Sequence, residues 1–497
     1  MKKIRIAGCI LALIQFILSA VLIYFLMRTH MFPQRYIVMG GIILGLLPIC
    51  FIAMQLRKVS GIIASILSIL VCCVVCYGMV KVNQANKMLD EVTGSKTEIE
   101  IVNVYVAKDD PVDSINQAVE KGYIFGIIAD NDNENIHKTI KDINNNNSAD
   151  VITEEFKSFK ELIVSFEGGN IQGFIVNSGM LGVLEGDENY KDYSSKLKII
   201  LEKKIETVVK TEPKKPKTDR QTNDGTYQRF CAYLSGIDTY GEVTLKSRSD
   251  VNVIAVINTK THTVLLLSTP RDYYVPLAKD GEPLDKLTHA GIYGIDMSMS
   301  TLENLYNIDI DYYFRVNFTG FVDIIDTIGG VDVESDYTFT SQLNSNYSYV
   351  QGTNHLYGEA ALFFARERYS FTEGDRQRGR NQMAVIRAVM NKLLSSELLN
   401  NFSEVMSQMK DCFQTNMEKE ELGTLIQGQI DNGGGWNIIQ YSVNGSDTMD
   451  YCYSLGDNAY VMPPYYDTVE YATELANKVL NDEEITQEYI DSNAPVH

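Results

Sequence analysis

Three long apolar segments near the N-terminus restrict most strongly what this chain of 497 residues can fold into. They cover residues 6–27, 36–55 and 62–80, and each is close to the ~20 residues that a helix needs to cross a bilayer. Three buried core helices of a soluble protein are the less favoured interpretation, because core helices are rarely so long and so poor in charge. We therefore predict a three-helix transmembrane region over residues 1–82.

Basic residues around these segments predict how they are oriented. Lys2, Lys3 and Arg5 precede the first segment, and Arg57 and Lys58 separate the second from the third. Positive charge favours the cytoplasmic side, although two arginines in the loop between the first two segments weaken this bias. Three crossings from a cytoplasmic N-terminus predict a multi-pass cell-membrane protein whose main domains lie on the extracytoplasmic side.

Residues 95–210 alternate short β-rich runs with helical patterns, which is typical of a small accessory α/β domain. This region contains no glycine-rich phosphate loop and no clustered histidine or cysteine, so we expect a role in spacing or interaction rather than in chemistry. Residues 211–226 are rich in Pro, Lys, Thr and Asp and contain almost no apolar residue. That composition predicts a linker and a domain boundary.

The segment 227–395 has the pattern of a third domain, a sheet with helices packed on it. Two β-rich runs at 251–257 and 263–268 are joined by an NTKT turn and predict a β-hairpin. Helical patterns follow at 297–306, 318–327, 358–364 and 382–394. Residues 396–497 form an acidic C-terminal region in which we find no catalytic pattern and to which the sequence assigns no role. The fold class is therefore mixed α/β.

Charge and cysteine content exclude some classes of function. With 64 acidic and 44 basic residues, the chain lacks the basic balance of a general nucleic-acid binder. Only Cys231, Cys412 and Cys452 lie outside the apolar N-terminal region, and they form no metal-binding ladder. Cys412 and Cys452 have the option of a disulfide outside the membrane, but buried free thiols are the favoured interpretation.

Five arginines fall within the fifteen residues from Arg366 to Arg380, in a chain of formal net charge −20. Guanidinium groups bind phosphate oxygens in a planar, two-pronged geometry, so this cluster predicts a site for a phosphorylated or pyrophosphorylated ligand. The alternative is a solvated helix end, because Glu367, Glu373 and Asp375 are interleaved with the arginines.

Spacing within the run separates stronger from weaker candidates. Arg366 and Arg368 are two residues apart, so they share a face only on an extended backbone, and the preceding helix then has to end near residue 365. The turn-like residues that follow allow the chain to double back and present Arg378 to the same ligand. Arg376 and Arg380 are the weaker candidates, since each is free to pair with a neighbouring carboxylate.

Two segments upstream offer carboxylates and further arginines. Asp238 lies in YLSGIDTYG, whereas Arg248 and Asp250 lie in KSRSDVNVIAV at the start of a strand. A magnesium ion bound to phosphates needs only one or two protein carboxylates, so Asp238 and Asp250 are the candidate pair, with ordinary turn or cap carboxylates as the alternative. Arg271 follows the second hairpin strand and a proline, and this rigid turn suits a binding role.

The order of seven motifs across about 227–394 resembles the LytR-CpsA-Psr (LCP) family of bacterial envelope proteins. These motifs are YLSGIDTYG, RSDVNVIAV, LLLSTPRDYYVPL, DKLTHAGIYG, YYFRVNFTGF, FARERYS and GDRQRGRNQM. Three membrane spans followed by an accessory α/β region further resemble the capsule-associated branch. The resemblance implies a domain with a central mixed sheet flanked by helices. It also implies binding of a polyprenyl pyrophosphate-linked glycan, with the lipid tail in an apolar groove, and its transfer to peptidoglycan with magnesium as cofactor.

The resemblance also implies roles for individual residues. It assigns Asp238 and Asp250 to magnesium, and it assigns the pyrophosphate to Arg248, Arg271, Arg366, Arg368, Arg378 and Gln382. Arg366 and Arg368 would take part in catalysis with Asp375, which is our candidate for the group that accepts the proton of the attacking hydroxyl.

In three places the motif match leaves a role open. Asn381 stands where the family more often has an arginine, so either Arg380 replaces that guanidinium or the acceptor subsite differs. Lys286 and His289 lie in a matching motif, and we expect them to contact residues that bind the ligand rather than the ligand itself.

The expected activity is thus extracytoplasmic, magnesium-dependent transfer of a lipid-linked glycan, capsular polysaccharide in particular, to peptidoglycan. One alternative is a membrane regulator or scaffold of capsule assembly that binds the glycan, or a capsule-assembly protein, without transfer. Another is a pyrophosphatase, in which water attacks instead of a sugar hydroxyl. In each case the partners are a polyprenyl pyrophosphate glycan and the membrane, not nucleic acid.

Overall fold

The computed structural model describes residues 2–29, 32, 34–93, 97–129, 134–146, 149–208, 229–395, 405, 409 and 411–497. The predicted linker at 211–226 lies outside the described residues.

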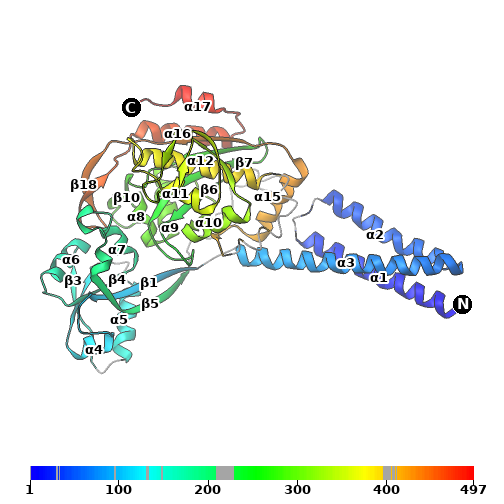
Figure 1. Ribbon diagram of the computed structural model, residues 1–497, viewed down its shortest axis with the longest axis horizontal. Helices are drawn as coiled ribbons and strands as arrows, with labels where there is room; N and C mark the ends of the chain where they lie inside the picture. Colours follow the sequence, from blue (N-terminus) through cyan, green and yellow to red (C-terminus); the bar gives the residue numbers. More distant parts are fainter. Residues whose placement is uncertain are drawn as a thin grey trace.

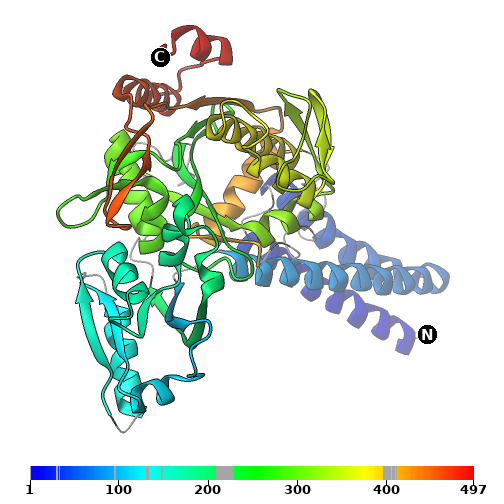
Figure 2. The same ribbon diagram turned by 60° about the vertical axis from the view of Figure 1, so that its left-hand side comes forward.

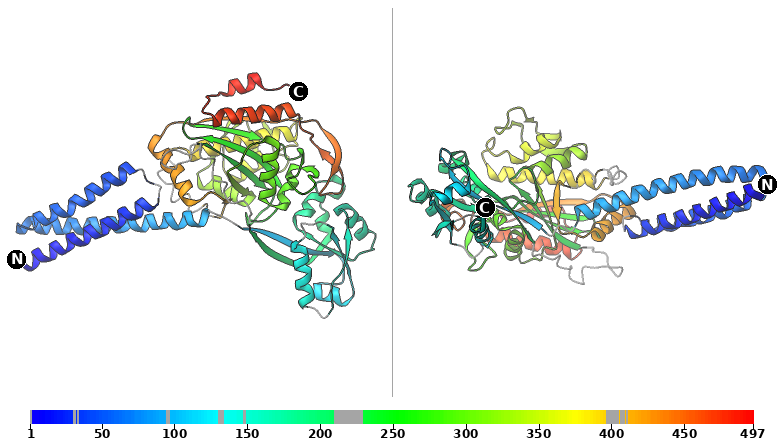
Figure 3. Two further views of the ribbon diagram at one scale, coloured as in Figure 1. Left: turned by 180° about the vertical axis from the view of Figure 1, so that it is seen from behind. Right: turned by 90° about the horizontal axis from the view of Figure 1, so that it is seen from below.

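Three apolar helices form a rod that projects from the rest of the molecule (Figure 1). They are α1 (Lys2–Arg28), α2 (Gln34–Met54) and α3 (Lys58–Val92). Each contains a stretch long and apolar enough to cross a membrane, of 24, 21 and 27 residues respectively. The N-terminus lies at the far end of the rod and the main body at the other end, as Figure 3 also shows from behind.

A five-stranded sheet follows the rod, in the order β3-β2-β4-β1-β5. Its strands are β1 (Thr97–Ala107), β2 (Ile124–Ile128), β3 (Ile152–Phe156), β4 (Gly173–Asn177) and β5 (Leu197–Val208). Its helices are α4 (Ile115–Glu120), α5 (Glu134–Asn146), α6 (Phe159–Glu167) and α7 (Gly179–Leu184), and short 3-10 turns cover Glu188–Tyr190 and Tyr193–Lys196. The sequence did not predict β3, because this edge strand exposes most of its side chains and shows no apolar alternation.

A six-stranded mixed sheet forms the centre of the main body, in the order β16-β11-β6-β7-β8-β17. Its strands are β6 (Arg229–Ile237), β7 (Ser249–Asn258), β8 (Thr263–Ser268), β11 (Tyr312–Asn317), β16 (Phe413–Thr415) and β17 (Asn437–Ser442). The expected hairpin is the antiparallel pair β7 and β8, whereas β11 is parallel to β6 and β17 is parallel to β8.

Helices cover both faces of this sheet. One face packs against α8 (Leu287–Tyr293), α9 (Ile295–Tyr306), α16 (Tyr466–Leu480) and α17 (Gln487–Asn493). On the other side lie α10 (Phe318–Thr327), α11 (Gly358–Arg366), α12 (Asp375–Leu393) and α15 (Lys419–Asn432). Within β7, Ile254 and Val256 pack in the first core, on the face covered by α8, α9, α16 and α17. Val253 and Ala255 pack in the second core, on the opposite face, which explains the continuous apolar run of this strand.

Four short two-stranded ribbons complete the main body. They pair β9 (Tyr274–Pro276) with β10 (Leu284–Lys286), β12 (Val331–Ser335) with β15 (Gly352–Leu356), β13 (Phe339–Thr340) with β14 (Ser348–Tyr349), and β18 (Thr448–Cys452) with β19 (Asp457–Val461).

The C-terminal region, to which the sequence assigned no role, is part of the main fold. It supplies β16 and β17 at the two edges of the six-stranded sheet, and α16 places Ala472 and Leu475 in the first core. Division of the chain at residue 395 therefore does not match the packing. The strands β16 and β17 pair with strands that lie roughly a hundred residues or more earlier in the chain, and local patterns carry no sign of this pairing. Cys412 and Cys452 are both buried and are free thiols, as the sequence favoured.

Candidate functional site

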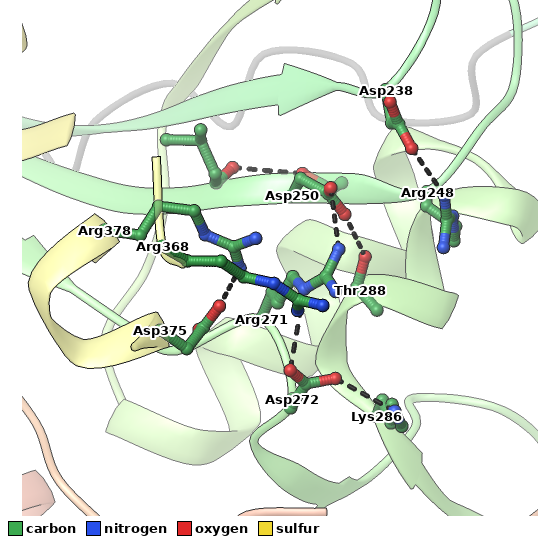
Figure 4. A network of polar contacts seen from close by, with 12 residues as sticks. Asp238, Arg248, Asp250, Arg271, Asp272, Lys286, Thr288, Arg368, Asp375 and Arg378 are labelled. Atoms are coloured by element: carbon green, nitrogen blue, oxygen red, sulfur yellow. Dashed lines mark hydrogen bonds and ion pairs between the residues drawn. The ribbon is translucent and has the colours of Figure 1, made fainter. Parts of the chain in front are cut away.

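The topology of the central sheet brings the predicted carboxylates and arginines to one edge. β6 and β7 are antiparallel, so the end of β6 meets the start of β7, where Ile237 pairs with Ser249. Asp238 directly follows β6, Asp250 is the second residue of β7, and Arg271 lies in the turn after β8. These side chains converge on one polar network, which α8 and the start of α12 complete (Figure 4).

Asp250 and Arg271 form the centre of this network. Arg271 Nη1 donates to Asp250 Oδ2 over 2.8 Å, and Thr288 Oγ1 donates to Asp250 Oδ1 over 3.0 Å. Burial opposes ionisation of Asp250, but the positive charges of Arg271, Arg248 and Arg378 outweigh it and lower the pKa of Asp250. Asp250 is therefore held as a carboxylate, and Thr288 is a site residue that the sequence did not single out.

Asp272 supports Arg271 from the side opposite Asp250. Arg271 Nε lies 3.5 Å from Asp272 Oδ2, and Lys286 Nζ lies 3.0 Å from Asp272 Oδ1. Burial opposes ionisation of Asp272, yet Arg271 and Lys286 lower its pKa. Arg271 is thus fixed between two carboxylates, and the only hint in the sequence was an acid directly after the arginine.

The two residues expected to contact ligand-binding residues have separate partners. Lys286 contacts Asp272, as described above, whereas His289 Nδ1 lies 2.6 Å from Asp285 Oδ1. Ser454 N also donates to Asp285 Oδ2, over 2.7 Å. Both His289 and Asp285 are buried, so this pair ties α8 to the segment after β18.

Asp238 forms an ion pair with Arg248 at the outer end of the network. Burial and the negative charge of Asp250 raise the pKa of Asp238, against the opposing effects of Arg248, Arg366 and Arg271. Burial is the main cause of the raised pKa of Asp238, and the charge of Asp250 adds to it, so a cation bound beside both carboxylates would favour the ionised form of Asp238.

The start of α12 adds Arg378 and Asp375, which form an ion pair one helical turn apart. Burial and the charge of Arg271 lower the pKa of Arg378, while Asp375 and Asp250 act in the opposite direction. Asp375 and Asp250 balance part of the positive charge of these two guanidinium groups, and the placement of the guanidinium groups beside each other suits an additional anionic ligand. Gln382 lies one turn after Arg378, on the same face of α12.

Arg366 and Arg368 lie at the end of α11, where the backbone becomes extended at Glu367, as their spacing required. The Arg366 guanidinium lies 4.2 Å from the centre of the Phe318 ring. Arg368 extends over the network in Figure 4, and its Nη2 donates to the Tyr369 hydroxyl over 2.8 Å. Neither group is held in a described salt bridge, so both guanidinium groups remain able to bind an anion.

The salt-bridged alternative drawn from the sequence holds for Glu373 and Asp375, which pair with Arg380 and Arg378. It is wrong for Glu367, which does not pair with the neighbouring arginines. Its side chain is buried, Oε1 accepts from the backbone N–H of Tyr369 and Ser370, and Oε2 accepts from Ser341 Oγ and Gln342 N. It thereby fixes the turn that carries Arg368. A buried glutamate between two arginines is indistinguishable from a surface salt bridge in the sequence.

The two weaker arginines face away from the network. Arg376 binds Asp447, with Nη2 3.3 Å from Oδ1, and Arg380 pairs with Glu373. Asn381, which replaces the expected arginine, is buried and donates through Nδ2 to Phe364 O over 3.1 Å. Asn381 therefore connects α12 to α11. Arg380 pairs with the Glu373 carboxylate and does not replace the guanidinium that the family more often has at position 381.

Asp238 and Asp250 fit the needs of a phosphate-bound magnesium ion. In the part of the chain that the structure describes, no group of three or more His, Cys, Asp or Glu residues is arranged to hold a metal. Magnesium bound to phosphates takes one or two protein carboxylates and completes its shell with water and phosphate oxygens. Two adjacent carboxylates, one with a raised pKa, provide that donor set.

Known proteins resemble this chain over the same region. Residues 195–462 match the LytR_cpsA_psr family, which is more than half of the chain. A stretch of 190 residues is 36% identical to the polyisoprenyl-teichoic acid–peptidoglycan teichoic acid transferase TagU of Bacillus anthracis (strain CDC 684 / NRRL 3495) and covers 38% of this chain and 61% of that protein. The TagU of Enterococcus faecalis (strain ATCC 700802 / V583) is 31% identical over 204 residues, covering 41% and 66%.

The match therefore spans less than two thirds of the length of these curated relatives. Among solved structures, the crystal structure of TagV from B. subtilis has 28% sequence identity and a TM-score of 0.45, and it covers 51% of this chain and 98% of that one. The family match includes the six-stranded sheet from β6 to β17 and the polar network at its edge. The chain belongs to the LytR_cpsA_psr family.

Proposed function

We propose that this protein transfers a glycan from a polyprenyl pyrophosphate carrier to peptidoglycan on the outer side of the cell membrane. The observation that carries the proposal is the convergence of Arg248, Arg271, Arg368 and Arg378 on two neighbouring carboxylates at one sheet edge. Family membership and the printed activity of the TagU relatives, transfer of teichoic acid to peptidoglycan, support it.

The arginines bind and orient the pyrophosphate. Arg271 is locked between Asp250 and Asp272, so its guanidinium keeps one orientation and the protein needs little rearrangement when charge develops. Arg366 and Arg368 lie at the end of α11 and are proposed to donate to the pyrophosphate oxygens as well. Phosphoryl transfer needs mostly positioning and charge neutralisation, which this set of side chains provides.

In the proposed reaction, a peptidoglycan hydroxyl attacks the phosphorus next to the glycan. The new bond joins the acceptor oxygen to that phosphorus, the bond from phosphorus to the bridging oxygen breaks, and polyprenyl monophosphate leaves with the bond electrons. The hydroxyl proton passes to a carboxylate, for which we propose Asp375, at the start of α12 beside Arg378. Gln382 is proposed to hydrogen-bond the phosphate oxygens from the next turn of the helix.

Asp238 and Asp250 would hold a magnesium ion on the pyrophosphate. When bound, such an ion neutralises phosphate charge and stabilises the leaving oxygen. It would also favour the ionised form of Asp238, whose pKa is raised by burial and by the charge of Asp250.

The rod of three helices supports the proposed location. If all three helices cross the membrane, a cytoplasmic N-terminus would place the network outside the cell, where peptidoglycan is found. We propose capsular polysaccharide as the glycan, on the resemblance to the capsule-associated branch of the family, whereas the curated relatives act on teichoic acid.

A transfer assay tests the proposal against its alternatives. The purified full chain in detergent micelles is incubated with magnesium, a polyprenyl pyrophosphate glycan and peptidoglycan fragments, and the products are identified by mass spectrometry. We expect the mass of glycan phosphate joined to peptidoglycan, lost in Arg378→Gln and retained in Arg387→Ala, an exposed arginine farther along α12. Intact donor would favour a binding scaffold, and free glycan phosphate would favour a pyrophosphatase, so either result contradicts transfer.

A further inference from the structure

Arg248 lies at the boundary between the two sheets of the molecule. Its guanidinium forms an ion pair with Asp238 in the polar network. On its other side is α7, a helix that belongs to the five-stranded sheet and follows β4. The two parts are adjacent in Figures 1 and 2, where α7 lies beside α8. One side chain of the network thus contacts both parts of the protein.

The contact is made at a glycine. The three heavy atoms nearest to a Cβ placed on Gly182 are Nε, Cζ and Nη2 of Arg248, at 3.1, 3.5 and 3.6 Å. A Cβ on Gly186 would lie 3.9 Å from Nη1 of the same side chain. The Arg248 guanidinium therefore rests directly on the backbone of α7, in space that any side chain at position 182 would partly fill.

The helix α7, on which the Arg248 guanidinium rests, is itself packed against the main body. Buried Met180, Leu181 and Val183 of α7 share a core cluster with Ile292 of α8 and with Leu455. Gly179, at the start of α7, lies so close to α8 that an added Cβ would meet Ile292 Cγ2 at 3.1 Å. α7 is therefore packed against α8 as well as against the Arg248 guanidinium.

Charged groups near the start of β1 hold the two parts together. Glu98 and Arg315 form a buried ion pair between β1 and β11, and Lys246 Nζ lies 3.2 Å from Glu100 Oε2. Lys246 is only two residues from Arg248. The backbone on which Arg248 sits is therefore itself anchored to β1.

We propose that the accessory α/β part positions Arg248 for the pyrophosphate, with Gly182 of α7 as the positioning residue. The inference rests on the proposed function, because it assumes that Arg248 binds the ligand. It gives the accessory part a role that its sequence did not reveal. α7 forms one wall of the Arg248 side-chain position, and the glycine leaves room for the guanidinium between this wall and Asp238.

A double-mutant cycle tests the proposal by measuring the affinity of the full chain, in detergent micelles with magnesium, for geranylgeranyl pyrophosphate. We expect Arg248→Ala to weaken binding roughly tenfold, because it removes a charge-assisted hydrogen bond to phosphate. Gly182→Val should weaken binding by a similar factor, because the added side chain displaces the Arg248 guanidinium. In the Arg248→Ala background, Gly182→Val should change the affinity by less than about twofold, because it acts only through Arg248. Gly428→Val, at a helical glycine of α15 with open space around it, is the control.

Gly182→Ala keeps the test decisive if the valine variant does not fold. Alanine needs Arg248 to shift by only a few tenths of an ångström, and it favours helix over glycine. We expect weaker pyrophosphate binding with an unfolding midpoint equal to or above wild type. Unchanged affinity in both glycine variants, or equal losses with and without Arg248, would overturn the positioning role alone. Absence of binding by the wild type would overturn the proposed function and the inference with it.

Discussion

Glu98 of β1 and Arg315 of β11 form an ion pair in which the side chains are 5% and 2% exposed. Ile295 N also donates to Glu98 Oε1, over 3.2 Å. This pair connects the five-stranded sheet to the six-stranded sheet, and a partner left alone would be a buried charge without compensation. The two sheets are thereby joined as one structural unit.

Glu98→Gln is therefore expected to lower the free energy of unfolding by about 3–5 kcal/mol. Lys204 and Glu242 form another ion pair between the same two parts, but their side chains are 51% and 52% exposed. Glu242→Gln is the matched control and should cost no more than ~1 kcal/mol. Urea unfolding followed by the fluorescence of Trp436, the single tryptophan, measures both variants. Equal losses would show that burial of the Glu98 pair has no energetic role.

Asp238 is expected to lower stability in the absence of magnesium. Its pKa is raised in the fold, so its contribution is fully present below the unfolded pKa of ~3.9 and is lost as pH rises through the folded pKa. At pH 7 without magnesium, Asp238→Asn should thus raise the thermal midpoint, by about 2 °C. Magnesium should then raise the midpoint of the wild type but not of the variant. A lower midpoint for Asp238→Asn would contradict this interpretation of the charge balance.

Magnesium affinity is expected to fall as the pH is lowered toward the raised pKa of Asp238, because protons compete with the cation for the same carboxylate. Asp250 should not contribute to this loss, since Arg271 and the other arginines keep its pKa low despite burial. Isothermal titration of magnesium into the pyrophosphate-loaded protein at several pH values measures the effect. An affinity that does not depend on pH between about 4 and 7 would argue against Asp238 as a ligand.

Arg271→Lys is expected to weaken pyrophosphate binding roughly tenfold although it keeps the positive charge. The guanidinium spans Asp250 and Asp272 through Nη1 and Nε, and an ammonium group cannot occupy both positions. Binding of geranylgeranyl pyrophosphate to the variant and to Arg387→Ala, the exposed control, checks this. Wild-type affinity in Arg271→Lys would mean that charge alone, without the fixed geometry, determines binding.

The two termini are expected on opposite sides of the membrane. A protease added to intact cells should remove an epitope tag placed after His497 and leave a tag placed before Met1 untouched, because the three proposed crossings would separate the N-terminus from the main body. Detergent lysis, which exposes both tags, is the control. Protection of the C-terminal tag in intact cells would contradict the proposed location.

Much of the network could be predicted from the sequence because its residues lie at the ends of a recognisable hairpin. Asp250 is the second residue of β7 and Arg271 follows β8, so the pairing of these two strands is enough to bring the two side chains together. The spacing of Arg366 and Arg368 likewise required the end of α11, and the structure confirms this end. Local patterns carry such information because neighbouring strands share one edge.

Other parts of the fold and of the network could not be predicted, because they depend on contacts between residues that are far apart in the sequence. Asp272, Glu367 and Arg315 are buried charged residues, yet in the sequence each resembles a surface residue. The strands β16 and β17 join the central sheet only through distant partners. Gly182 looks like an ordinary helix residue until Arg248 is placed beside it.

The central claim is that the arginine network recognises a pyrophosphate, and the affinities for geranylgeranyl pyrophosphate and geranylgeranyl monophosphate test it most directly. The two probes share a lipid and differ by one phosphate group. With magnesium, we expect the pyrophosphate to bind at least about tenfold more tightly, and this difference to disappear in Arg368→Ala combined with Arg378→Gln. Equal affinity of the wild-type protein for the two probes would contradict the account.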